Sequence, residues 1–216
     1  YAPKPDIVAQ MQAQTDAEFV HSLRLAVGGG LTRAALVLLG RPEATYALGG
    51  PTPRISWQLV DHRGDHVTHQ HFELPLVLAI DALVGRVRII DVNLLPPREV
   101  APLNLPNYDD WVLREALHNC VAHQDYAQGG RILVTESPDT LRFFNYGEFL
   151  PGSVDKVLHA AQPEQRYRNA CLANAMVELD LMETINSGVK GMFRKQRERF
   201  FPLPDYAIEG QPASVS

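Results

Sequence analysis

The chain has few cysteines and no long apolar run, and each shortage excludes a class of protein. Two cysteines in 216 residues are too few for a disulfide framework. Both Cys120 and Cys171 lie in apolar helical patterns, as small core residues of a reducing compartment do. No apolar run reaches the length of a membrane span, and we find no signal peptide pattern. We therefore expect a cytoplasmic protein without membrane contact.

An excess of basic residues is also missing. The 20 Lys and Arg against 25 Asp and Glu give a net charge of −5, so the surface as a whole does not favour nucleic acid. Any such binding needs a local basic patch. Arg194, Lys195, Arg197 and Arg199 form one basic run near the end of the chain. This run either contacts nucleic acid phosphates or is a solvated helix face with cations near its C-terminus.

The phosphate-binding pattern G-x-x-x-x-G-K-[S/T] does not occur, which argues against a helicase motor. What remains is an ordinary globular composition, with 45% hydrophobic and 21% charged residues. The length suits one large domain or two small ones. Because the chain opens on Tyr1 instead of Met, we expect it to be part of a longer protein.

The first half alternates helical and strand patterns. Thr15 to Glu18 is a capping-box pattern that predicts a helix through Leu25, ending at the glycines 28–30. The other elements we predict are a helix over 32–39 ending at Gly40, a strand over 54–60, a turn over 62–69, a returning strand at 71–72, and a helix with Pro75 at its first position.

The second half follows a proline-rich stretch, 91–107, which we interpret as the connection between the halves. We then predict a helix over 108–123, a hairpin of 131–135 with 141–145, a loop over 145–152, a helix from Ser153 to 159, a helical stripe over 172–182 that breaks at 186–188, and a loose tail over 207–216. This order predicts an α+β fold with helices packed on a mainly antiparallel sheet.

Glu115 and Asn119 are the most informative pair in the chain. They lie one turn apart on the same face of the helix predicted over 108–123. The opposite side is apolar, and the flanks of the pair are partly apolar too, so both sides of the helix are covered. A Glu and an Asn in such a place need partners, because burying an unpaired charge is costly. A metal ion, water and phosphate would serve, and so would neighbouring backbone groups.

The same helix carries a resemblance to a known family. Residues 113–126 (LREALHNCVAHQDY) are similar to a signature of RecG-related, Schlafen/AlbA-associated bacterial proteins. The C-terminal half of those proteins resembles a GHKL-type ATPase domain. Three further stretches agree with that family in the same order: 31–40 (LTRAALVLLG), 145–152 (NYGEFLPG) and 186–189 (NSGV).

The resemblance implies roles for individual residues. Glu115 would be the general base and Asn119 the ligand of Mg²⁺, with His123, Asn145, Gly147, Ser187 and Gly188 contacting ATP. It also implies an AlbA-like domain before a first subdomain (1–105), an ATPase-like domain (106–206) and the tail (207–216). DNA would be bound through that absent N-terminal domain, and the protein would be a transcriptional regulator or helicase-related protein, with a homodimer as a further expectation.

Departures from the family pattern support an alternative. Phe149 stands where the second glycine of the base-binding loop belongs, and Asn186 replaces the first glycine of G-S-G. Asn145 lacks the charge of the usual aspartate and is open to a second interpretation as a turn residue. The chain could then be a non-catalytic, ATPase-like scaffold for dimerisation or DNA-linked regulation.

Two local patterns each allow two interpretations. His62, His66, His69 and His71 form either part of a zinc site or an exposed hairpin. After His123, Asp125 could accept a hydrogen bond that fixes the tautomer of that histidine. Alternatively, His123 simply favours the negative end of its helix.

Overall fold

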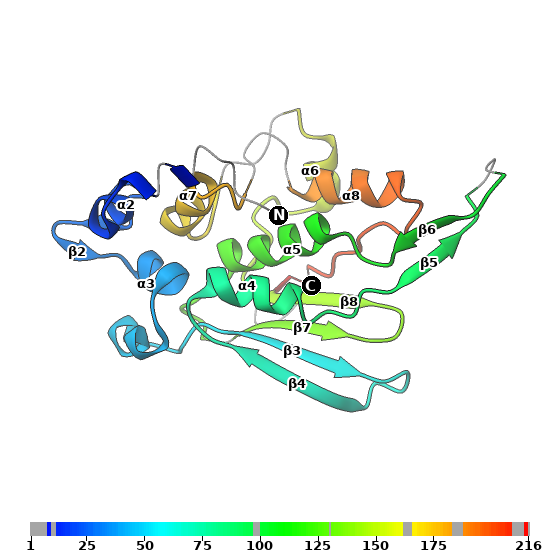
Figure 1. Cartoon of the computed structure of the whole chain (residues 1–216), viewed down its shortest axis with the longest axis horizontal. Coiled ribbons are helices and arrows are strands. Elements are labelled where there is room, and N and C mark those ends of the chain that lie inside the picture. Colours follow the sequence, from blue (N-terminus) through cyan, green and yellow to red (C-terminus); the bar gives the residue numbers. More distant parts are fainter. Residues whose placement is uncertain are drawn as a thin grey trace.

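The structure, a computed structural model, describes residues 8–9, 12–96, 100–129, 131–161, 166–182, 188–208 and 214–215. The fold is α+β, as predicted. Helices cover one side of a five-stranded sheet whose strand pairs are mainly antiparallel, and a narrow two-stranded ribbon extends from this body (Figure 1).

The sheet has the order β4-β3-β7-β8-β9. Its strands are β3 (Ile55–Val60), β4 (His66–Phe72), β7 (Ile132–Glu136), β8 (Leu141–Tyr146) and β9 (Ser214–Val215). All neighbours are antiparallel except β3 and β7, which run parallel with Trp57 opposite Val134. This pairing joins strands from both sides of the boundary expected between residues 105 and 106, and the division into domains stays a prediction.

The sheet strands follow the alternation of the sequence. Ile55, Trp57 and Val134 are fully buried and face the helices, as period-two patterns require. The returning strand begins at His66, earlier than predicted, so the second half of the predicted 62–69 turn is strand. A register shift between Leu59 and Val60 accommodates this early start.

The helices are α2 (Asp16–Ser22), α3 (Arg33–Leu39), the 3₁₀ helix η1 (Pro42–Leu48), α4 (Leu76–Val84), α5 (Asp110–His123), α6 (Val154–His159), α7 (Ala170–Glu178) and α8 (Gly188–Glu198). The predicted capping box at Thr15 is confirmed. The side chains of Thr15, Thr32 and Ser153 each accept a hydrogen bond from a backbone N–H of the first turn. None of the described helices combines the length and apolar character that a membrane span needs.

Several predicted segments are wrong in their detail. The first helix ends at Ser22, and a small ribbon of β1 (Ala26–Val27) and β2 (Gly30–Leu31) follows it. The predicted connection over 91–107 contains β5 (Asp91–Leu94) paired with β6 (Leu103–Pro106). Within the predicted tail, Ser214 and Val215 pair with β8 instead of being loose. In each case the deciding contacts are strand pairings that a local pattern does not display.

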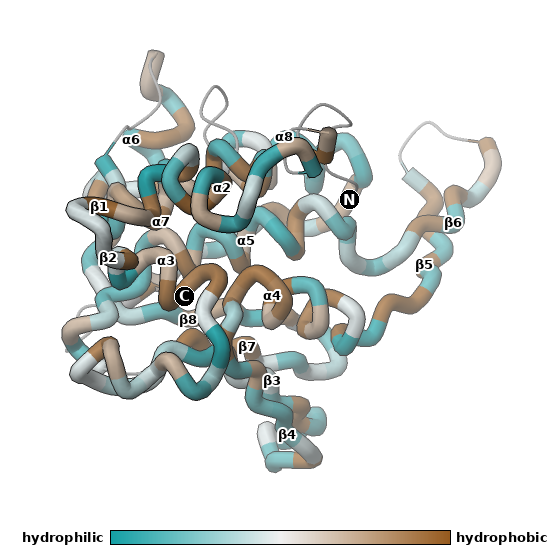
Figure 2. The backbone as a smooth tube through the Cα atoms, turned by 60° about the vertical axis from the view of Figure 1, so that its left-hand side comes forward, coloured by the Kyte–Doolittle hydropathy of each residue, from teal (hydrophilic) through white to brown (hydrophobic). Residues whose placement is uncertain are grey.

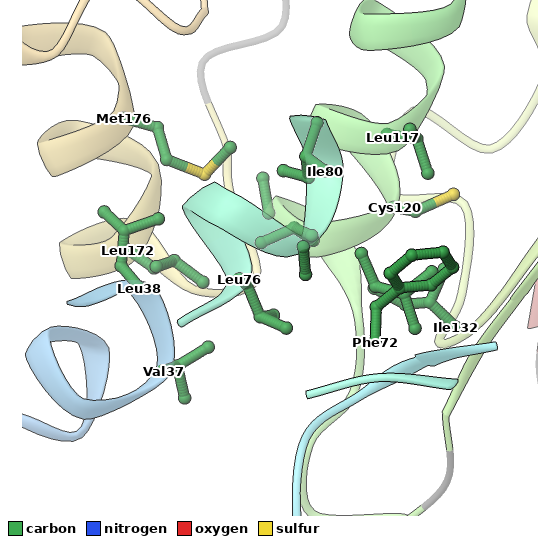
Figure 3. Packing of buried hydrophobic residues seen from close by; sticks show 14 of the residues in the cluster. Val37, Leu38, Phe72, Leu76, Ile80, Leu117, Cys120, Ile132, Leu172 and Met176 are labelled. Atoms are coloured by element: carbon green, nitrogen blue, oxygen red, sulfur yellow. The ribbon is translucent and has the colours of Figure 1, made fainter. Parts of the chain in front are cut away.

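The core is centred on α4. This helix carries mostly hydrophobic residues, which are brown in Figure 2, and Leu76, Ile80 and Leu83 are at most 1% exposed. Figure 3 shows Leu76 and Ile80 between the side chains of α3 and α7 on one side and those of α5 and the sheet on the other. Full burial of one such side chain contributes roughly 1.5–3 kcal/mol. The core therefore holds α5 firmly above the sheet.

Candidate functional site

Helix α5 carries the candidate site on the side that the apolar core does not use. Asp109 caps the helix by accepting a hydrogen bond from the backbone N–H of Val112. Leu117 and Val121 are fully buried in the core. Glu115, Asn119 and His123 are spaced by four, so they follow one another along a single face.

Glu115 and Asn119 are bonded to each other. The Nδ2 of Asn119 donates to Oε1 of Glu115 at 2.9 Å and to the Glu115 backbone carbonyl at 2.7 Å. Glu115 is only 5% exposed. Because the amide nitrogen of Asn119 is directed at Glu115, its oxygen is the atom that can bind a cation.

Gly188, the first residue of α8, lies against this pair. A Cβ built at Gly188 would be 1.7 Å from Oε1 of Glu115 and 3.0 Å from Nδ2 of Asn119. Two motifs separated by more than sixty residues in the sequence therefore meet at one point. Ser187, the other predicted residue of this motif, lies outside the described residues.

His123 lies at the end of the same face. Its ring stacks on Tyr167 with 5.6 Å between ring centroids. Burial, followed by the charge of Arg168, lowers the pKa of His123, which favours the neutral imidazole. Of the two interpretations left open for His123, the bond to Asp125 is not formed, and the Asp125 carboxylate accepts from Ala127 and Gln128 in its own turn.

Gly147 approaches the C-terminal end of α5. Its φ of 123° suits glycine, and a Cβ there would lie 2.8 Å from Nε of Arg168 and 3.1 Å from the carbonyl of His123. Asn145 is buried within β8 instead of a loop, and its Nδ2 donates to the carbonyl of Tyr146. The interpretation of Asn145 as a turn residue is thus wrong, because the strand continues to Tyr146.

Arg168 and Tyr167 belong to the site although the sequence analysis did not select them. Arg168 donates to the carbonyl of Glu148 at 3.3 Å and lies 3.7 Å from the Asp125 carboxylate. Its Nε is buried without a hydrogen-bond partner. Neither residue belongs to a motif or a periodic pattern, so only the fold brings them to α5.

An aromatic cluster adjoins Glu115. The ring of Tyr206 lies 5.9 Å from that of Phe149 and stacks on Phe193 at 6.4 Å between centroids. Burial, and then the charges of Cys120 and Glu115, raise the pKa of the Tyr206 hydroxyl. The segment that follows α8 therefore lies within electrostatic reach of the predicted general base.

Some side chains of the basic run on α8 make contacts within the protein. Lys195 lies 3.3 Å from Asp109 and 5.4 Å from the centre of the Trp111 ring. Arg199 donates to the backbone carbonyl of Pro106. These contacts favour a structural role for part of the run.

The histidines of the β3–β4 hairpin lie close together. Nε2 of His66 is 3.2 Å from Nδ1 of His69, and Nδ1 of His71 is 2.9 Å from the Ser56 hydroxyl. Within the described parts of the chain, no group of three or more His, Cys, Asp or Glu side chains is arranged to hold a metal ion. The zinc alternative therefore gains no support from this hairpin.

Comparison with known proteins relates the second half of the chain to a family. Residues 129–216 match the model of a family described as "Putative ATP-dependent DNA helicase recG C-terminal". The matched part resembles an ATPase-like domain of RecG-related proteins. It includes Asn145, Gly147 and Gly188, whereas α5 lies before it.

A solved structure shares the fold over nearly the whole chain. The DIP2311 protein from Corynebacterium diphtheriae superposes with a TM-score of 0.73 at 18% identity, covering 99% of this chain. The present chain spans 44% of that solved chain. No curated protein matches.

Proposed function

We propose that this chain binds ATP together with Mg²⁺ on the Glu115–Asn119 face of α5, as the body of a bacterial transcriptional regulator or helicase-related protein. The observation that carries the proposal is the meeting of Gly188 with Glu115 and Asn119. A residue without a side chain at the start of a helix of eleven residues, beside a carboxylate and a carboxamide, suits a phosphate–metal site.

Each residue has a chemical role in this proposal. Asn119 would hold Mg²⁺ through its side-chain oxygen, and the bound metal would neutralise phosphate charge. Backbone N–H groups at the start of α8 would donate to the phosphates. Glu115 would accept a proton from the water that attacks the terminal phosphate, if the nucleotide is turned over.

The other end of the site suits the nucleobase and sugar. Asn145 uses its amide nitrogen within the protein, so its carbonyl oxygen would accept a hydrogen bond from an exocyclic amino group. Gly147 would leave room for the Arg168 side chain beside this end of the site. Neutral His123, stacked on Tyr167, would donate or accept a hydrogen bond near the ligand without adding charge.

Calorimetric titration with Mg²⁺ and a non-hydrolysable ATP analogue tests the proposal. Asn119→Ala should abolish the binding heat, because it removes the proposed metal ligand. Asn174→Ala, on the exposed surface of α7, is the matched control and should bind as the parent chain does. Equal binding by Asn119→Ala and the control would refute the assignment. If binding is found, Glu115→Gln then separates binding from hydrolysis.

The aromatic cluster favours a second candidate, a non-catalytic scaffold for dimerisation or DNA-linked regulation. Tyr206 lies near Glu115, and Phe149, at the position of a family glycine, contacts its ring. Absence of binding heat and of a thermal shift at millimolar nucleotide would support this candidate. Sedimentation would then test dimerisation, and a longer chain carrying the expected N-terminal domain would test DNA binding.

A further inference from the structure

The sheet has a second face that none of the labelled helices covers. Ile55, Trp57 and Val134 point toward α4 and α5, so the residues between them point the opposite way. In Figure 1 the labelled helices lie on one side of the sheet. We call the opposite side the outer sheet face and define it by His69, His71, Leu133, Arg142, Phe144 and Tyr146.

The register places these residues in rows across four strands. His71 is opposite Ser56, Ser56 is opposite Leu133, and Leu133 is opposite Phe144. The next row runs from His69 through Gln58 and Thr135 to Arg142. These two rows contain basic, polar and apolar side chains and no carboxylate.

Two further arginines extend the basic character at one end of the face. Arg54 precedes β3 and Arg131 precedes β7, and the backbone N–H of Ile132 donates to the carbonyl of Arg54 at 3.2 Å. Partial desolvation and the charges of Arg54, His69 and Arg131 lower the pKa of His71, while Glu73 opposes them. The electrostatic environment of His71 is thus mainly cationic although the whole chain carries −5.

Aromatic rings lie beside these cations. Phe144 and Tyr146 are half-buried neighbours on β8, with ring centroids 5.1 Å apart in an edge-to-face arrangement. Neither ring belongs to the core beneath the helices. When the register that pairs Leu133 with Phe144 is continued by two residues on each strand, Tyr146 lies opposite Arg131.

We propose that the outer sheet face of this chain binds single-stranded nucleic acid, with Phe144 and Tyr146 stacking on bases and Arg54 and Arg131 contacting phosphates. Basic side chains along a strand-lined surface track the backbone, and aromatic rings stack on unpaired bases whatever the sequence. A duplex fits this face less well, because its bases are already stacked on each other. This site is separate from the proposed nucleotide site on α5, on the other side of the sheet.

Fluorescence anisotropy with a labelled oligothymidylate of about 12 nucleotides tests this proposal, since single OB-type sites cover roughly 4–16 nucleotides. The whole 216-residue chain is used, at several salt concentrations. Phe144→Leu keeps an apolar side chain but loses the ring, and should weaken binding about 5- to 100-fold. Arg131→Gln should reduce the slope of log K against log salt by about 0.7.

Arg33→Gln, on the exposed side of α3, is the matched control for a lost positive charge and should leave binding unchanged. Circular dichroism and the melting temperature check that Phe144→Leu is folded. Titration of Phe144→Leu with the ATP analogue tests whether the two proposed sites are independent. Binding of the analogue should be the same as in the parent chain.

Three outcomes would overturn the proposal. The first is failure of the folded parent chain to bind the oligonucleotide at low salt. The second is equal binding of a duplex, with no effect of Phe144→Leu, which would indicate non-specific attraction. The third is self-association of the chain that Phe144→Leu abolishes, which would assign the outer sheet face to a second copy.

Discussion

Gly188, the first residue of α8, lies so close to the carboxylate of Glu115 that no side chain fits at position 188. A Cβ at Gly188 would lie 1.7 Å from Oε1 and 2.6 Å from Cδ of Glu115. Because Glu115 is buried and bonded to Asn119, it cannot move aside without breaking that bond. This contact fixes where α8 begins relative to α5.

Gly188→Ala should therefore disturb the candidate site. We expect a loss of about 1–3 kcal/mol in the free energy of unfolding, as for other overpacked positions, together with loss of nucleotide binding. Urea denaturation and calorimetry measure the two effects. Gly50→Ala, where nothing lies within 4 Å of the new methyl group, is the matched control. Unchanged stability of Gly188→Ala would show that α8 does not pack against Glu115.

Stability should fall as the pH is lowered from about 6.5 to about 4, because of His118. Burial, assisted by the charge of Arg114, lowers the pKa of His118 to about 4 from its usual 6.5. Between these values the unfolded chain binds a proton that the folded chain does not, so acid favours unfolding. The loss amounts to about 3 kcal/mol and ends below pH 4.

His118→Gln should flatten this part of the pH profile, measured as the free energy of unfolding in urea at each pH. His159→Gln, on exposed α6, is the matched control. A profile that keeps its full slope in His118→Gln would assign the acid sensitivity to other groups, such as His123.

The buried carboxylate of Glu136 should contribute strongly to the stability of the β3–β7 region. It accepts a hydrogen bond from the Trp57 indole at 2.9 Å and pairs with Arg88 at 2.5 Å. Arg88→Ala leaves a buried charge with one partner fewer, and should cost about 2 kcal/mol. Thermal and urea unfolding measure the loss. The loss should shrink when Glu136→Gln is already present, and an undiminished loss would show that Arg88 acts through other contacts.

The two cysteines should react differently with thiol reagents. Cys171 is exposed, so its prediction as a core residue is wrong, whereas burial raises the pKa of Cys120 to about 12. Because the thiolate is the reactive form, the native protein should take up one equivalent of Ellman's reagent quickly. Cys171→Ser should remove the fast phase, and Cys120→Ser should leave it. Two fast equivalents in the native protein would contradict the burial of Cys120.

Local signals allowed much of the secondary structure to be predicted. The helix over 108–123 begins two residues later than expected, at Asp110, because Asp109 provides the cap. Ser153 caps a helix that ends at His159, as predicted. The turn at 137–139 joins β7 to β8, since Pro138 and Asp139 favour a reversal. These signals depend on a few neighbouring residues, so the sequence displays them directly.

Non-local contacts could not be predicted. The parallel pairing of β3 with β7 and the placement of Ser214 beside Tyr146 depend on segments far apart in the chain. For the candidate site, Glu115, Asn119 and Gly188 were selected from motifs, and the structure brings them together. Arg168 and Tyr206 were missed, because each reaches the site only through the path of the chain around α5.

The parallel pairing of β3 with β7 also affects how the chain folds during its synthesis. During synthesis β3 emerges well before β7, and at about 5–20 residues per second it waits for several seconds without its inner neighbour. During this time β3 has only β4 beside it, and an isolated two-stranded hairpin is marginally stable. The apolar side chains Ile55 and Trp57 would then be exposed on the nascent chain. This interval is when a chaperone at the ribosome would protect the protein most from aggregation.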